Sequence, residues 1–255
     1  MRTIKQPLAV ALGISVALSG CATPHPLVHP QWTASPRQRL GIAPLYYEVQ
    51  TNAPTPQAAT AFQERVSASH AEFAHVVGQL LRDKPFTLLN TPQVYQALVR
   101  QETLSPEVRS RLDSAINSLV DANRFVADRL YGGRGTPLDV TMGNAVQELP
   151  AVLGVTPEAW LWVIVTGSKE SGASYGGRMG KQIFWSLLML VATLGLFMLV
   201  PNPQRGHGFI ASALVVEPQT GQVLWWNRLS SSGDPLNVDG DVRGELRKIL
   251  QDLHP

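Results

Sequence analysis

The sequence predicts an α/β domain with a single mixed sheet and flanking helices. Segments 39–46 and 159–167 are rich in apolar, β-branched and aromatic residues, as buried strands are. Segments 209–217 and 222–230 have the same character, and only the turn-forming residues 218–221 (Pro-Gln-Thr-Gly) separate them. Because helical periodicity fills much of the chain between the first two strands, helices are expected to precede a closing antiparallel hairpin.

The elements of the first half follow from local signals. A helix is expected over 57–81, where apolar residues recur every three or four positions, and Pro85 prevents its continuation. Segment 86–90 (Phe-Thr-Leu-Leu-Asn) predicts a second strand. A further helix is expected over 91–101, with a threonine cap followed by proline at its first position.

Three more helices complete the expected order. Ser-Pro-Glu opens a helix over 105–131, and a shorter helix is expected over 140–153. The last is an amphipathic helix near the C-terminus, with Asp239 as its predicted N-cap.

Four tryptophans lie in the predicted strands. Because side chains alternate between the two faces of a sheet, Trp160 and Trp162 should share a face, whereas Trp225 and Trp226 should lie on opposite faces. Core packing or an interface explains these residues better than a ligand cage does.

The first residues have the layout of a secretory signal. Arg2 and Lys5 are followed by the apolar run 8–18 and then by Leu-Ser-Gly-Cys, which ends at Cys21. This stretch resembles the lipobox of bacterial lipoproteins. The resemblance implies cleavage before Cys21 and attachment of lipid to its thiol and its new amino group. Since Ala22, not aspartate, follows the cysteine, the resemblance also implies transfer to the outer membrane.

The composition excludes several kinds of function. Cys21 is the only cysteine, so the lipidated chain has no thiol for a disulfide, a thiolate metal site or a nucleophile. Loss of Arg2 and Lys5 with the signal leaves 19 basic residues against 19 acidic ones. This balance gives no support for nucleic-acid binding.

The chain therefore divides into three parts. Residues 1–20 are the expected signal peptide, and the proline-rich residues 21–38 are expected to form an extended tether. Residues 39–255 are expected to form the α/β domain, into which a hydrophobic helix over 183–200 is inserted.

The run 183–200 carries no charge, and as a helix it would be roughly 27 Å long, enough to cross a hydrocarbon core. It could span the inner membrane once, pack in the core of the domain, or project from the domain into a membrane or into neighbouring copies. A single span would separate strand 159–167 from strands 209–217 and 222–230. We therefore expect the residues after Val200 to lie on the same side of the membrane as Cys21.

A mildly polar stripe favours association of this helix. Gln182, Ser186, Met189 and Thr193 recur at helical spacing, and helices in lipid often meet along such stripes. These four residues are the candidate contacts for membrane insertion or self-association.

Three segments resemble a group of bacterial envelope domains. They are "RLGIAPL" from residue 39, "FTLLNTPQVYQAL" from residue 86 and "LVVEPQTGQVLWW" from residue 214. They are similar to the amino-terminal domain of TolB, the lipoproteins LpoB and CsgG, and the meningococcal GNA-type lipoproteins. Two features depart from the group: the acidic residue of the turn is displaced to Glu217, and the hydrophobic run is additional. The resemblance therefore implies the fold more than an activity.

No motif predicts a metal or catalytic site. His70 and His75 are five residues apart on one predicted helix and do not share a face. Asn237, Asp239 and Asp241 begin like a calcium loop, but glycine and glutamate are missing at the positions where that loop requires them.

Residue types suited to a hydrolase also occur near the C-terminus, but none lies in a nucleophile elbow. They are Ser230, Ser231, Ser232, Asp234 and His207. The glycine-rich stretch 172–181 lacks the spacing of a phosphate loop and is interpreted as a linker.

The sequence thus predicts a lipid-anchored, periplasm-facing lipoprotein with an assembly, scaffolding or partner-regulating role and no cofactor. The expected partners are the membrane, through Cys21 and the run 183–200, and an envelope protein or further copies of the chain. Nucleic acid is not an expected partner. One alternative is a subunit of an oligomeric export or pore complex, and a weaker one is an envelope hydrolase.

Overall fold

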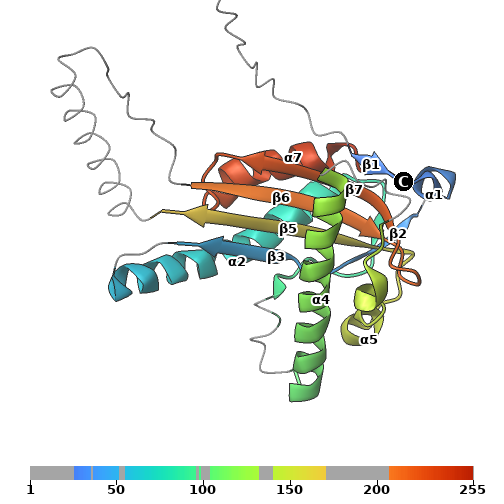
Figure 1. Ribbon diagram of the computed structural model, residues 1–255, viewed down its shortest axis with the longest axis horizontal. Coiled ribbons are helices and arrows are strands. Elements are labelled where there is room, and N and C mark those ends of the chain that lie inside the picture. Colours follow the sequence, from blue (N-terminus) through green and yellow to red (C-terminus); the bar gives the residue numbers. More distant parts are fainter. Residues whose placement is uncertain are drawn as a thin grey trace, which may run out of the picture.

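The computed structural model describes residues 26–35, 37–51, 55–95, 98, 104–131, 140–170 and 207–254, with the backbone alone for 122–131 and 144–145. These residues form a seven-stranded mixed sheet with the order β1-β7-β6-β5-β2-β4, and β3 also pairs with β5 (Figure 1). The predicted α/β class with one mixed sheet and flanking helices is confirmed.

The strands are β1 (Leu27–Val28), β2 (Arg39–Ile42), β3 (Tyr46–Gln50), β4 (Thr87–Leu88), β5 (Ala159–Lys169), β6 (His207–Val216) and β7 (Val223–Ser231). The helices are α1 (Pro30–Ala34), α2 (Pro56–Arg82), α4 (Pro106–Tyr131), the short η2 (Gly143–Val146), α5 (Leu149–Leu153), η3 (Val238–Val242) and α7 (Arg243–Gln251).

The centre of the sheet is the antiparallel pair β5 and β6. Their register runs without interruption from Trp160 opposite Val216 to Lys169 opposite His207. β7 pairs with the other edge of β6, and the predicted turn at 218–221 connects the two strands. Gly221 closes this turn with a φ of 71°, and a Cβ there would lie 2.3 Å from the carbonyl oxygen of Gly143. Glycine is therefore needed at Gly221 for both backbone conformation and space.

Helices cover both faces of the sheet. α2 and α7 pack on one face, and α4 crosses the other, on the near side in Figure 1. Side chains of β5 alternate between the two layers, as the pleat requires. Leu161 and Val163 lie in the core under α2 and α7, whereas Trp160 and Trp162 lie in the core under α4.

The predicted placement of the tryptophans is confirmed. Trp160 and Trp162 share one core, while Trp225 and Trp226 belong to opposite cores. All four are at most 5% exposed, so they are packing residues.

The single strand expected over 39–46 is divided into β2 and β3, which both run parallel to β5. Pro44 lies between them and has no N–H to continue the ladder. Its carbonyl oxygen instead accepts a hydrogen bond of 2.9 Å from Nε1 of Trp162. Leu45 instead bonds to the segment after β4: its N–H donates to the carbonyl oxygen of Gln93, and its carbonyl oxygen accepts from the N–H of Tyr95.

The folded domain begins earlier than Arg39, the expected boundary. Within the stretch expected to be a tether, Leu27 and Val28 pair with β7, and the following helix α1 buries Trp32 to 2% exposure. The prolines of this segment do not keep it extended in solvent, because burial of the large aromatic side chain of Trp32 stabilises the folded arrangement.

Two other boundaries also differ from expectation. The helix predicted over 140–153 is split into η2 and α5. Asp239 is not the N-cap of the last helix: it lies inside η3, which leads directly into α7, and it pairs with Arg243 at 2.5 Å. The helices over 57–81 and 105–131 are confirmed as α2 and α4, and the helix over 91–101 falls partly outside the described residues.

Gly41 is a position where the core leaves no room. A Cβ there would lie 2.5 Å from Cζ3 of the fully buried Trp160 and 2.8 Å from Cγ of Pro157. We expect Gly41→Ala to lower the free energy of unfolding by about 1–3 kcal/mol, because overpacking forces neighbours to shift. Urea unfolding of the detergent-solubilised protein measures this loss.

Gly244→Ala is the matched control. A Cβ at Gly244 in α7 would meet nothing within 4 Å, so alanine should raise the free energy of unfolding by up to about 1 kcal/mol through its helix propensity. Equal urea midpoints for Gly41→Ala and the parent would contradict the packing of Trp160 against β2.

Candidate functional site

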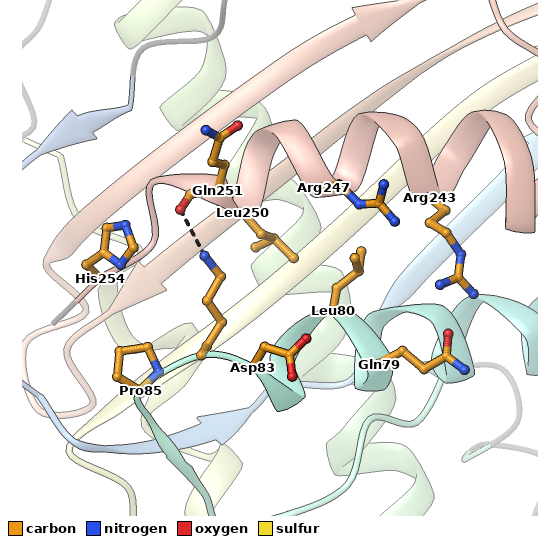
Figure 2. Close-up of a pocket in the computed structure, with 10 residues that line it drawn as sticks. Gln79, Leu80, Asp83, Pro85, Arg243, Arg247, Leu250, Gln251 and His254 are labelled. Carbon is orange, nitrogen blue, oxygen red and sulfur yellow. Dashed lines mark hydrogen bonds between the residues drawn. The ribbon is translucent and has the colours of Figure 1, made fainter.

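A groove lies between the end of α2 and the length of α7. Its volume is about 560 Å³. Figure 2 shows Arg243 and Arg247 extending from α7 opposite Gln79, Leu80 and Asp83. The complete lining is Gln79, Leu80, Asp83, Lys84, Pro85, Arg243, Arg247, Leu250, Gln251 and His254.

The amphipathic character of α7 positions the two arginines. Leu246 and Ile249 are fully buried and fix the inner face of the helix on the sheet. Arg243 and Arg247 are four residues apart, so they share a face at the border of this buried stripe. On the other wall, α2 ends at Arg82, and the chain turns away from the helix, so the side chain at position 84 faces the end of α7.

Lys84 joins the two walls of the groove. Its Nζ donates a hydrogen bond of 2.9 Å to the carbonyl oxygen of Gln251, at the C-terminus of α7 (Figure 2). Burial lowers the pKa of the Lys84 ammonium group, although the nearby charge of Asp252 opposes this shift. A cation at the C-terminus of a helix also complements the helix dipole.

Positive charge predominates in the groove. Arg243 pairs with Asp239, whose side chain is 68% exposed, whereas Arg247 has no ion pair with any described residue. Asp83 is the one carboxylate in the lining, against Lys84 and the two arginines. Guanidinium groups bind carboxylates and phosphates through paired hydrogen bonds and keep their proton, so the groove is suited to binding an anion.

The site residues predicted from the sequence lie elsewhere. Cys21 and the stripe Gln182, Ser186, Met189 and Thr193 fall outside the described residues. Within the described residues, no helix combines the length and apolar composition needed to cross a membrane. The groove itself was not predicted: the spacing of Arg243 and Arg247 was visible in the sequence, but the wall opposite them was not.

The residue types suited to a hydrolase do gather, at the end of the sheet where β5 and β7 finish. The Ser231 hydroxyl accepts from Gly233 N–H at 3.1 Å and donates to Glu245 at 3.4 Å. The Asp234 carboxylate pairs with Lys169 and accepts from Leu236 N–H at 2.9 Å. These bonds fix the chain after β7. The carboxylate beside the Ser231 hydroxyl is that of Glu245, which also pairs with Lys248 at 3.0 Å.

The histidines and acidic residues considered as metal ligands have separate partners and do not form a common site. The His70 ring packs edge-on against Tyr47 at 5.4 Å, while His75 bonds to Gln79 at 2.7 Å. Asp241 accepts a hydrogen bond from the backbone of Asp234, away from Asp239. No group of three or more potential metal-ligating side chains occurs among the residues that the structure describes.

Comparison with known proteins shows a distant structural likeness. No family model matches the sequence, and no curated protein matches it. Among solved structures, the chain is similar to the LpoB C-terminal domain from Salmonella enterica, with 9% identity and a TM-score of 0.23 over 76% of this chain and 81% of that one. LpoB is among the proteins that the sequence resembles; the resemblances to TolB, CsgG and the GNA-type lipoproteins stay predictions.

The Lys169–Asp234 pair makes stability depend on pH. Burial opposes ionisation of Asp234, but the hydrogen bonds from Lys169 and Leu236 and the charges of Lys169 and His207 outweigh it, and the pKa of the carboxyl lies below its ordinary value. Such a group stabilises the fold above its unfolded pKa, about 4, and the contribution is lost as the pH falls through the lower folded pKa.

Asp234→Asn should therefore lower the free energy of unfolding at pH 7 by about 1–2 kcal/mol, and the difference from the parent should shrink below about pH 4. Urea midpoints between pH 2.5 and pH 8 measure this, and Asp239→Asn, whose side chain is 68% exposed, serves as the control. A difference that stays constant across this range would refute the assigned role of the pair.

Proposed function

We propose that this chain is a lipid-anchored, periplasm-facing envelope module that binds an acidic segment of a partner protein in the groove between α2 and α7. The observation that supports this proposal is that Arg243, Arg247 and Lys84 all line the groove, in which Asp83 is the one carboxylate among the lining residues. The side chains of lysine and arginine end in hydrogen-bond donors and offer no acceptor. The proposed role is therefore binding and not catalysis.

The groove also offers apolar surface. Leu80 and Leu250 contribute to its lining between the charged groups. An acidic peptide segment with an aliphatic side chain would pair its carboxylates with the arginines and cover these leucines. The permanent charge of Arg247 would also steer such a segment into the groove.

The sheet supports a position on one side of the membrane. β5 and β6 are neighbours along their full lengths, so residues before 170 and residues after 206 belong to one folded unit. A single crossing by 183–200 would require this ladder to be broken, with the loss of its backbone hydrogen bonds. The arrangement favours an insertion whose two ends lie on the same side of the membrane. It is also compatible with the alternative of a pore or export subunit assembled through that run.

A hydrolase is the weaker alternative. The Ser231 hydroxyl is directed to Glu245, and the Asp234 carboxylate is held by Lys169. These partners give both groups a structural role and so favour the binding module.

Arg247→Glu should abolish anion binding without unfolding the protein, because Arg247 is exposed and forms no ion pair with a described residue. With poly-glutamate as the probe, we expect the dissociation constant to rise at least tenfold, which is about 1.4 kcal/mol. Binding by the parent should weaken with added salt.

Arg65→Glu is the matched control, since it makes the same charge change at an exposed position of α2 away from the groove. It should alter the dissociation constant less than twofold. Equal losses for the two variants would show that overall charge, and not the groove, determines binding.

Cys21→Ala should leave the chain without lipid, because Cys21 is the only cysteine. We expect the protein to move from the membrane fraction to the soluble periplasmic fraction, which immunoblotting of fractionated cells measures. Incorporation of labelled fatty acid into the variant would contradict the lipoprotein assignment. Retention in the membrane without lipid would favour the alternative in which 183–200 inserts by itself.

A further inference from the structure

Two segments with a predicted affinity for lipid leave the sheet in the same direction, although β1 itself pairs with Trp225 and Trp226, nearer the start of β7. The first is the insertion between β5 and β6, which contains the apolar run 183–200. Lys169 and His207 are direct partners in the ladder, so the insertion departs and returns at adjacent positions. The Cα atoms of such a pair are about 5 Å apart.

The direction of β1 places the second segment. β1 is antiparallel to β7, with Leu27 opposite Trp226 and Val28 opposite Trp225. Towards the N-terminus, the chain therefore heads along β7 in the direction of Ser231. Ser231 is opposite Phe209, two residues from His207, and so lies at the end of the sheet where the insertion begins and returns.

The chain from Leu27 to Cys21 has the length needed to reach that end. Its six residues span at most about 20 Å. The five residues from Trp226 to Ser231 rise about 17 Å. A lipidated Cys21 can therefore lie level with the pair Lys169 and His207.

We propose that this end of the sheet is the membrane-facing end of the domain and that it rests on the headgroups of a phospholipid bilayer. The membrane-facing end comprises Gln50, Lys169, His207 and Ser231, at which β3, β5, β6 and β7 start or finish. The strands then stand upright on the bilayer. This inference rests on the proposed lipid anchor and adds to it the orientation of the domain.

The same orientation places one end of the groove away from the lipid. The β6–β7 turn lies at the opposite end of the sheet, about 30 Å away along the nine residues of β7. Lys84 and Pro85 are also at that end, because they directly precede β4, whose Thr87 is opposite Arg39 at the start of β2. The Arg243 end of the groove lies nearer the membrane-facing end, because Glu245, two residues further along α7, accepts a hydrogen bond from Ser231.

Two single-cysteine variants of the full lipidated protein test the orientation. Ser232→Cys lies beside the membrane-facing end and Gln219→Cys in the β6–β7 turn; both positions are exposed. Lipid occupies the thiol of Cys21, so each variant offers one thiol for a fluorophore. The proteins are reconstituted in vesicles of phosphatidylethanolamine and phosphatidylglycerol that carry a nitroxide on the headgroup.

We expect the nitroxide to quench the Ser232→Cys label at least threefold more than the Gln219→Cys label. Ser230→Cys, also exposed, is a second reporter near the membrane-facing end and should follow Ser232→Cys. Equal quenching at the two ends, or stronger quenching at Gln219→Cys, would overturn the orientation.

Flotation of the same vesicles separates this inference from the proposed anchor. Proteins that float with the vesicles but show equal quenching retain the anchor and refute the orientation alone. Proteins that do not float refute the anchor, and the orientation is refuted with it. Proteins that float with selective quenching of Ser232→Cys support both.

Discussion

The uninterrupted antiparallel ladder between β5 and β6 is the constraint on which the rest of the structure depends. Its two strands supply side chains to both cores, with Trp160 and Trp162 on one side and Leu161 and Val163 on the other. All other strands of the described residues pair directly or through a neighbour with these two. Because the backbone groups of a buried strand need partners, the ladder also joins the residues before 170 and those after 206 in one folded unit.

The groove is a consequence of how one face of this sheet is covered. α2 and α7 bury their apolar stripes side by side in a single core. The polar border of α7 then faces the end of α2, and Lys84 links the two by its bond to Gln251. The positive charge of the groove thus comes from residues at the border of the buried stripe of α7, so it does not interrupt the hydrophobic packing.

The strand directions give the domain two ends with different chemistry. The insertion returns to the sheet at Lys169 and His207, while the tight turn at Gly221 and the Lys84 end of the groove lie at the other end.

The sequence by itself determined the fold class, the long helices α2 and α4, the β6–β7 hairpin and the alternation of the tryptophans, because periodicity and turn chemistry are local properties. It also predicts a lipobox and contains the apolar run, and both lie outside the described residues. Only the tertiary structure decided the division of the first strand at Pro44 and the pairing of Leu27 with β7, because both depend on where Trp162 and Trp226 lie. The groove also depends on the tertiary structure. Lys84 and Arg247 are distant in sequence, and they line one groove because α2 and α7 pack on the same face of the sheet.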